Sequence, residues 1–425
     1  MKDLFGTIGT RYLIAALNLA LIFINAKILG VEGVGLVGLI LASTGIVTMF
    51  CGILAGNTIV YFMNRYSIRT VFFPSYCWIP VGAGIACILM AMSGLLPNGY
   101  AMDIYLLSVL SSLVAANARF LLGLNRIKGF NVTFILQGGL LFFVLLIFYY
   151  GLGKKDVSAY LWGMYVTNGI AFLVSLLLLL PSLGKDRADN GKEYSLPLLL
   201  KEMFAYGLWG SADNIAEILT TRLNYFFIKR FSGLESVGLL DAGTKISESV
   251  WHINRSIGFI EYSRIARTDD AEEQRQIALR FFKLTFCAVV LVMGVILLIP
   301  EWIYTDYLFN AGFKGMRKVI VGLSVGIVAL ACNSILGQYF IGSGKIRYSA
   351  ISSFIGLLSL LVSGHLLIPA YGMVGSAISS SIAFSSMLIF SFIVFCLKTD
   401  TRLREFGINR EDLMFVMSKI RKGKK

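Results

Sequence analysis

The chain has 425 residues, the length of about two or three soluble domains, but its composition excludes a water-soluble protein. Hydrophobic residues make up 57% of it and charged residues only 15%, against roughly 25% charged residues in soluble proteins. The formal net charge of +14 would suggest nucleic acid as the partner of a soluble protein. In a membrane protein the same excess is explained by topology, so no nucleic-acid partner is expected.

The apolar residues are grouped into stretches long enough to cross a membrane. A transmembrane helix needs about 20 consecutive, mainly apolar residues. Charged or turn residues separate twelve such stretches: 8–29, 36–63, 71–96, 104–124, 130–152, 158–181, 204–229, 236–262, 280–300, 318–342, 348–369 and 373–397. The segments between them are too short to hold another domain. We therefore predict an all-α polytopic membrane protein with twelve transmembrane helices.

The lysines and arginines predict the orientation of these helices. If the N-terminus is cytoplasmic, 26 of the 38 basic residues lie at cytoplasmic helix ends or in the tail, eight lie at external ends and four lie within helices. This bias toward one side is the positive-inside pattern. Both termini are therefore predicted to be cytoplasmic, and the basic residues of the tail are expected to lie against anionic membrane lipids.

An internal repeat divides the chain in two. The heptapeptides GVEGVGL, which starts at Gly30, and GLESVGL, which starts at Gly233, share five of seven residues at an offset of 203. The offset spans an even number of predicted helices, so both halves have the same orientation, as in transporters built from parallel repeats. The predicted domains are a six-helix lobe over 1–181, a cytoplasmic linker over 182–203, a six-helix lobe over 204–397 and a basic tail over 398–425.

Ionisable residues inside spans are costly in a membrane and usually mark a functional cavity. The eighth predicted helix carries five of them on one stripe, with spacings of 4, 3, 4 and 3: Asp241, Lys245, Glu248, His252 and Arg255. The seventh helix carries a second polar stripe, composed of Asp213, Glu217, Thr220 and Asn224. Arg11, Asn18 and Asn25 share a face of the first helix, and Arg119 ends a face of serine and alanine on the fourth. Such stripes are typical of the walls of a water-filled passage.

Two other interpretations of the stripes remain open. Asp241 with Lys245, and Glu248 with His252, are four residues apart and could neutralise each other along one helix. Polar stripes also join helices without lining a cavity. The carboxylates of the two stripes are candidates for coupling transport to an ion, and the alternative is that they form structural ion pairs. They are Asp213, Glu217, Asp241 and Glu248.

Motifs of soluble enzymes and metal sites are missing from the sequence. The segment around Gly342-Ser343-Gly344-Lys345 has Tyr339 where a phosphate-binding loop begins with glycine, and Ile346 where it ends with serine or threonine. The six cysteines form no CxxC pair, and there are only two histidines. We therefore expect no catalytic residue, no cofactor and no metal.

Several glycine-rich segments resemble one family of transporters. ILGVEGVGL, from Ile28 to Leu36, is similar to the loop between the first two helices of bacterial polysaccharide flippases of the O-antigen type. The repeated segment from Gly233 to Ile246 and the segment LIPAYGMVGSA, from Leu367 to Ala377, resemble the same group. These flippases belong to the multidrug/oligosaccharidyl-lipid/polysaccharide exporter superfamily. The likeness extends over essentially the whole chain and rests on glycines and aliphatic residues at fixed spacings.

The resemblance implies a V-shaped pair of six-helix lobes around a central cavity. It also implies the cargo, an oligosaccharide on undecaprenyl diphosphate, which moves from the inner to the outer leaflet of the bacterial cytoplasmic membrane by alternating access. Polysaccharide polymerases or assembly proteins would be further partners. On this reading the substrate-binding candidates are Arg11, Asn18, Asn25, Arg119, Asn224, Lys245, Trp251 and Arg255, with the cations meeting the diphosphate.

Two other functions remain as alternatives. The cavity stripes carry nearly as many carboxylates as cations, which leaves room for a cation-coupled exporter of small organic molecules. A membrane-bound polysaccharide polymerase or glycosyltransferase would be an enzyme, but such enzymes place catalytic residues on sizeable external loops. The external segments here are short, so transport is the favoured function.

Overall fold

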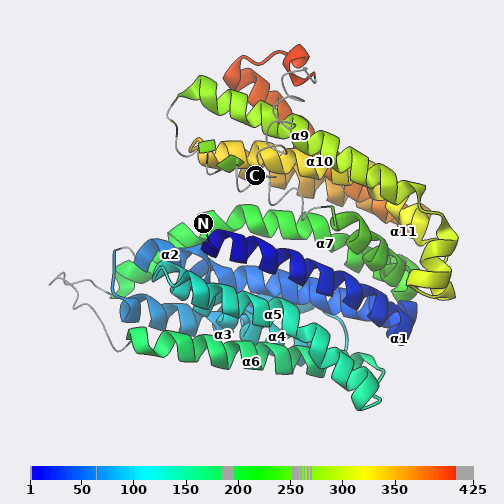
Figure 1. Cartoon of the computed structure of the whole chain (residues 1–425), viewed down its shortest axis with the longest axis horizontal. Coiled ribbons are helices and arrows are strands. Elements are labelled where there is room, and N and C mark those ends of the chain that lie inside the picture. Colours follow the sequence, from blue (N-terminus) through cyan, green and yellow to red (C-terminus); the bar gives the residue numbers. More distant parts are fainter. Residues whose placement is uncertain are drawn as a thin grey trace. The chain divides into compact units, whose positions relative to one another are not determined.

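The computed structural model describes residues 2–63, 65–183, 196–250, 258, 261–262, 264–265, 268 and 270–407. All regular elements in this part of the chain are helices (Figure 1). The long helices are α1 (Lys2–Ala55), α3 (Ile68–Met92), α4 (Ala101–Gly123), α5 (Ile127–Leu146), α6 (Val157–Leu183), α7 (Leu196–Glu248), α9 (Ala271–Leu298), α10 (Met316–Gly342) and α11 (Arg347–Thr399). The short elements are α2 (Asn57–Met63), the π-helices η1 (Ile147–Gly151) and η2 (Ile303–Leu308), and the 3₁₀-helices η3 (Ala311–Phe313) and η4 (Leu403–Phe406).

Three of the long helices are each two helices joined at a glycine. Gly30 in α1, Gly233 in α7 and Gly372 in α11 have φ values of 68°, 79° and 53°, which residues with a side chain rarely adopt. Dividing α1, α7 and α11 at these glycines, and joining α2 to the second half of α1, gives twelve helical segments within the described residues. They follow the twelve predicted spans in order, so the predicted all-α, twelve-helix fold class is confirmed.

Hydropathy varies among these helices. Eight of the described helices are long and apolar enough to cross a membrane, when α1 and α2 are counted as one helix and α11 is counted as one helix. Helix α7 is not among the eight, because charged residues recur along it. The most polar long helix is therefore the one that carries the predicted stripe of Asp213, Glu217, Thr220 and Asn224.

The helix ends that were predicted to share one side of the membrane are in contact. On the predicted external side, the segment between α9 and α10 packs onto α1, where the rings of Phe309 and Phe23 are 5.3 Å apart. On the predicted cytoplasmic side, Arg69 Nε donates to the Leu183 carbonyl at 2.8 Å, which joins the start of α3 to the end of α6. Both contacts join helix ends that the predicted topology places on the same side, and the orientation itself stays a prediction.

The chain divides into two compact units. The first comprises Met1–Ala242 with Glu301–Met316, and the second comprises Gly243–Pro300 with Arg317–Lys425. Most of α7 thus packs with the N-terminal half, although its sequence begins the second repeat. The predicted division into a linker over 182–203 and a second lobe over 204–397 follows the sequence repeat, and it stays a prediction.

Each unit has an asparagine that joins helices through buried hydrogen bonds. In the first unit, Asn117 Nδ2 on α4 donates to Ser175 Oγ on α6 at 2.9 Å. In the second, Asn333 Oδ1 on α10 accepts from Ser352 Oγ at 3.2 Å and Ser391 Oγ at 2.7 Å, one from each half of α11. Such bonds hold helices together in apolar surroundings. They show that part of the intramembrane polarity of this chain is structural.

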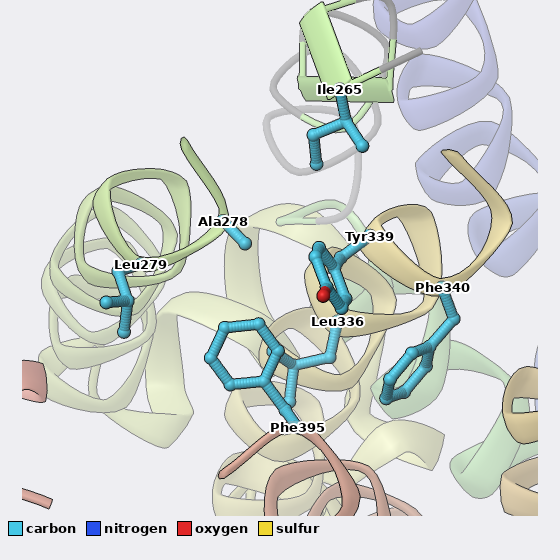
Figure 2. Packing of buried hydrophobic residues seen from close by; sticks show 7 residues of the cluster. All are labelled: Ile265, Ala278, Leu279, Leu336, Tyr339, Phe340 and Phe395. Carbon is cyan, nitrogen blue, oxygen red and sulfur yellow. The ribbon is translucent and has the colours of Figure 1, made fainter. Parts of the chain in front are cut away.

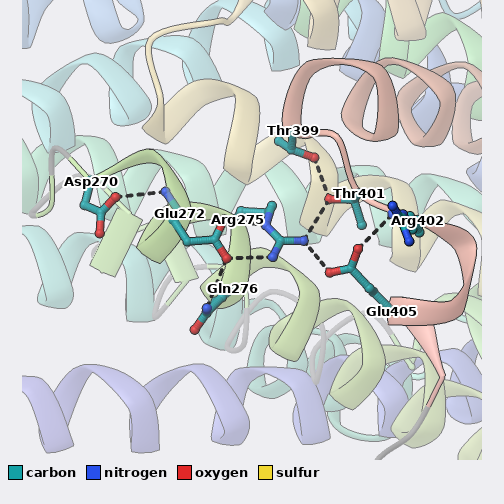
Figure 3. A network of polar contacts seen from close by, with 8 residues as sticks. All are labelled: Asp270, Glu272, Arg275, Gln276, Thr399, Thr401, Arg402 and Glu405. Atoms are coloured by element: carbon teal, nitrogen blue, oxygen red, sulfur yellow. Dashed lines mark hydrogen bonds and ion pairs between the residues drawn. The ribbon is translucent and has the colours of Figure 1, made fainter.

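An apolar cluster and a polar network lie at the predicted cytoplasmic end of the second unit. The cluster consists of Ile265, Ala278, Leu279, Leu336, Tyr339, Phe340 and Phe395 (Figure 2). In the network, Arg275 on α9 donates to the carboxylates of Glu272 at 2.6 Å and Glu405 at 2.5 Å (Figure 3). The ring of Phe406 packs against Phe392, with centroids 4.5 Å apart. Together these contacts fix η4 against α9 and the end of α11.

The network predicts how the η4 attachment depends on pH. Hydrogen bonds from Arg275 lower the pKa of Glu272 to about 2, and the backbone amide of Arg402 and then Arg275 lower the pKa of Glu405. A lowered carboxyl pKa contributes stability above the unfolded value of about 4.3, and the contribution is lost as pH falls through the folded pKa. The protection of residues 401–407 from hydrogen exchange, corrected for the intrinsic pH dependence of exchange, should therefore persist at pH 5 and be lost only as pH falls below the usual range of a glutamate.

Two variants make this measurement specific. Arg275→Gln should accelerate exchange in residues 401–407 already at pH 7, because it removes the donor shared by both carboxylates. Arg404→Gln is the matched control, since Arg404 is exposed on η4. Equal exchange in the two variants would show that aromatic packing alone holds the segment.

Candidate functional site

The predicted polar stripe of α7 passes from the surface of the first unit into its interior. Glu217 is exposed and Asp213 is half-buried. Toward the Gly233 kink, Thr220 and Asn224 are buried, with 0% and 1% of their surface exposed. The stripe therefore presents a carboxylate at the surface near the middle of the helix and leads to polar groups inside the bundle.

A buried carboxylate lies just beyond the kink. Asp241, with 2% of its surface exposed, accepts a hydrogen bond at Oδ1 from the Tyr225 hydroxyl at 3.2 Å. Tyr225 in turn accepts a hydrogen bond from Arg222 Nη1 at 3.1 Å. The kink at Gly233 makes this arrangement possible, because it places residues 225 and 241 of one continuous helix beside each other. The result is a chain of polar groups from guanidinium through phenol to carboxylate.

Glycine in α1 allows the carboxylate to fit. A Cβ atom at Gly38 would lie 2.8 Å from Asp241 Cγ and 3.1 Å from its Cβ, closer than side-chain carbons pack. The carboxylate of Asp241 therefore lies directly against the backbone of the second half of α1. At the same contact a residue with a side chain would displace Asp241 and break its bond to Tyr225.

The other candidates on α1 and α4 have different environments. Asn18 is exposed on α1. Asn25 accepts a hydrogen bond at Oδ1 from Tyr149 in η1 at 2.9 Å, so it has a structural partner. Arg119 is half-buried on α4 and makes no hydrogen bond or ion pair with any described residue. A guanidinium in this setting is expected to meet an anion.

Some candidates lie outside what the structure describes. Lys245 and Glu248 are half-buried in the last described turn of α7, and they belong to the second unit, whereas Asp241 belongs to the first. Trp251 and Arg255, together with the side chain of Arg11, lie outside the described residues. Among the residues that are described, no group of histidine, cysteine and carboxylate side chains could hold a metal ion.

Arg222 is not among the candidates predicted from the sequence, because helical spacing places it on the opposite side of α7 from Asp213 and Glu217. The structure shows that it belongs to the polar chain that ends at Asp241. The repeated glycine motif is the signal that could have identified Arg222. A break at Gly233 reverses the direction of the chain, so residues equally far before and after the break lie close together. Tyr225 and Asp241, eight residues on either side of Gly233, fulfil that condition.

Comparisons with known proteins give weak sequence matches and strong structural ones. No family model matches the chain. A "Putative O-antigen transporter" of Shigella flexneri is 22% identical over 187 residues, which are 43% of this chain and 44% of that protein. An uncharacterised membrane protein of Methanocaldococcus jannaschii is 22% identical over 45% of this chain and 38% of its own length. The chain thus matches less than half the length of these curated relatives.

The structural likeness extends over nearly the whole chain. An inward-facing multidrug-resistance transporter of the MATE family matches with a TM-score of 0.69, covering 91% of this chain and 94% of that one at 15% identity. The lipid II flippase MurJ matches with a TM-score of 0.64, covering 95% and 89% at 14% identity. The chain therefore has the fold of these transporters. The resemblance seen in the sequence is confirmed at the level of the fold, and the named O-antigen transporter and both solved structures are transporters or flippases and not enzymes.

A third structural neighbour shows how varied the superfamily is. It is a transporter of the same superfamily from Pyrococcus furiosus, described as having a binding pocket of reversed polarity and a different function, and it matches with a TM-score of 0.54 at 15% identity over 95% of both chains. One fold thus carries pockets of different charge. Cargo has to be inferred from the charged residues of the individual chain.

Proposed function

We propose that this multi-pass membrane protein is a flippase for an oligosaccharide linked to undecaprenyl diphosphate, moving it from the inner to the outer leaflet of the bacterial cytoplasmic membrane. Both termini would be cytoplasmic, as the positive-inside bias predicts. The proposal is supported by a relative named as an O-antigen transporter and by a structural neighbour that flips lipid II. Such a cargo needs a transporter, because a diphosphate–sugar head group does not cross hydrocarbon unaided, whereas its polyprenyl chain can remain in lipid.

The observation that carries the proposal is the environment of Arg119. Arg119 is half-buried one turn before the end of α4, without a hydrogen bond or ion pair to a described residue, and an arginine inside a span is costly unless it meets a partner. A diphosphate would compensate this cost, because guanidinium binds phosphate oxygens in a bidentate manner. Among the remaining candidates, the cations Arg11, Lys245 and Arg255 would also meet the diphosphate. The uncharged candidates, such as Asn18, which is exposed near the middle of the first predicted span, would meet the sugars.

The export assay tests the cargo directly. In a strain that lacks this protein, we expect completed undecaprenyl-diphosphate oligosaccharide to accumulate in the inner leaflet while surface polysaccharide disappears. Accumulation of single repeat units in the outer leaflet would instead indicate a polymerase. Normal glycans together with altered tolerance of organic cations would overturn the proposal.

Arg119→Ala should reduce export by at least about tenfold, the loss that removal of one charge-assisted hydrogen bond produces. Arg119→Lys should retain part of the activity, since a lysine keeps the charge but loses bidentate geometry. Lys128→Gln, which removes an exposed charge shortly beyond the same helix, is the matched control. Wild-type export by Arg119→Ala at normal membrane levels would remove Arg119 from the site.

A second function is favoured by one observation. Asp241 is a deeply buried carboxylate, as cation-coupled exporters of small organic molecules require. The Arg119 variants separate the two functions. Export of an organic cation should not depend on a phosphate-binding arginine, whereas a diphosphate cargo should.

A further inference from the structure

An apolar groove lies between α3 and the early turns of α7. It has a volume of about 640 Å³ and opens to the surface. Its described lining residues are Leu54 of α1, Trp78 of α3, and Leu200, Lys201, Phe204, Ala205 and Leu208 of α7. All of them belong to the first compact unit. The groove is therefore a feature of that unit alone, and it is lined by six apolar residues and one lysine.

The aromatic wall of the groove is held in place from behind. Trp78 Nε1 donates to the Phe50 carbonyl of α1 at 3.0 Å, so the polar edge of the indole is already bonded to the protein. Gly82 leaves room for the indole, because a Cβ atom there would lie 3.0 Å from Trp78 Nε1. The ring of Phe204 packs edge-to-face on Trp78, with centroids 5.4 Å apart. The wall thus has a defined shape before any ligand enters.

The early turns of α7 have one face inside the unit and another face on the groove. Leu199 and Met203 have 1% and 0% of their surface exposed. Lys201, Phe204 and Leu208 are exposed, and their spacings of 3 and 4 place them on one stripe of the helix. This stripe has a cation at one end and apolar side chains along the rest.

The order of these groups matches the order of groups in a phospholipid of the inner leaflet. The predicted topology puts the start of α7 on the cytoplasmic side, so Lys201 is nearest the head groups and Leu208 is deeper by about 10 Å, at about 1.5 Å per residue. Lysine keeps its ammonium among head groups while its stem lies along apolar surface. The cytoplasmic leaflet contains anionic lipids. The groove therefore presents a cation to a phosphate and apolar space to an acyl chain.

We propose that this groove binds an anionic phospholipid of the inner leaflet, with its phosphate at Lys201 and one acyl chain between Trp78 and α7. The inference rests on the predicted orientation and not on the cargo. The diphosphate of the proposed cargo is a poorer match, because guanidinium groups suit it better and the described residues of the groove supply a single ammonium. The tail over 408–425 has six basic and two acidic residues, so Lys201 would repel it.

Cross-linking at the groove tests the proposal on the purified full-length protein. The probe is phosphatidylglycerol with a diazirine on its acyl chain, and the yield is measured in peptides that contain Trp78 or Phe204. Unlabelled phosphatidylglycerol should compete about fivefold more strongly than phosphatidylcholine with the same acyl chains. Fivefold is the factor that one lysine near an anionic membrane surface contributes.

Three variants separate the head group from the acyl chain. Lys201→Gln should remove the preference for phosphatidylglycerol and leave competition by phosphatidylcholine unchanged. Lys128→Gln is the matched control, because Lys128 is an exposed lysine elsewhere on the predicted cytoplasmic side, and it should keep the full preference. Ala205→Leu adds a side chain inside the groove and should lower cross-linking of the probe at least about fivefold. Each substituted residue is exposed, so the fold should be retained.

Several results would overturn the phospholipid site. Equal competition by the two phospholipids would mean that the groove takes any acyl chain, and an equal loss of preference in Lys201→Gln and Lys128→Gln would mean that only the overall charge matters. Stronger competition by undecaprenyl diphosphate than by phosphatidylglycerol would assign the groove to the cargo. These measurements involve no transport, so a strain whose lipid-linked oligosaccharides are unaffected by loss of the protein would overturn the cargo and leave the groove supported.

Discussion

Asp241→Asn should abolish export while leaving the protein folded in the membrane. Asparagine has the size of aspartate, and its Oδ1 can still accept the Tyr225 hydroxyl, so the packing against Gly38 is retained. What is lost is a buried ionisable carboxylate, and such a group inside a membrane protein indicates binding or coupling by default. We expect export to fall by more than about a hundredfold, because loss of a hundredfold in rate corresponds to about 2.7 kcal/mol, within the range of one essential charged group. The measurement is the rate of surface polysaccharide appearance at equal membrane levels of protein.

Two neighbouring substitutions give this prediction its controls. Tyr225→Phe removes one hydrogen bond to Asp241 but keeps the carboxylate and the ring, so export should fall by less than about tenfold. Glu235→Gln removes an exposed carboxylate from the same part of α7 and should have no effect. If Asp241→Asn exports normally while Asp241→Ala fails to fold, the carboxylate is a structural group and the polar chain of Arg222, Tyr225 and Asp241 only holds the kinked helix together.

Hydropathy predicted the number and order of the crossings, because burial of about 20 apolar residues in lipid outweighs local preferences. The repeated motif also predicted where two helices break, since Gly30 and Gly233 adopt the same backbone conformation. The boundaries were less predictable. Helix α7 begins at Leu196, within the segment predicted as a linker. Its early turns contact distant parts of the chain, because Phe204 packs against Trp78 of α3 and Gly207 lies against the Ile53 carbonyl of α1. These contacts depend on residues far apart in the sequence and leave no local pattern.

The candidate site was predictable in part, for a similar reason. Helical spacing identified the stripe of α7 and the importance of Asp241, since both depend on residues within one helix. The role of Arg222 depends on the reversal of the chain at Gly233, and the burial of Asp241 depends on a glycine in α1. Pairing between helices is encoded in small residues at close contacts. Glycine occurs at helix breaks, at helix caps and at close helix contacts. The residue that contacts a given glycine can therefore be identified only from the three-dimensional structure.

The close pairing of α1 with α7 leads to the last prediction, which concerns the start of α7. A Cβ atom at Gly207 would lie 1.8 Å from the Ile53 carbonyl oxygen. That carbonyl already accepts the Thr58 hydroxyl at 2.7 Å, where α1 ends and α2 begins. Gly207→Ala should therefore push the start of α7 away from this junction and lower the free energy of unfolding by about 1–3 kcal/mol or more.

Gly210→Ala, less than one turn further along α7, is the matched control. Its Cβ would meet no atom within 4 Å, so the substitution should stabilise the helix by roughly 0.5–1 kcal/mol, because alanine loses less backbone freedom than glycine. Thermal unfolding of the purified proteins in detergent measures both changes. Opposite signs would show that contact between α1 and α7, and not helix propensity, selects glycine at residue 207. A decrease of equal size in both variants would mean that α7 tolerates no side chain on this face, and the specific contact with Ile53 would lose its significance.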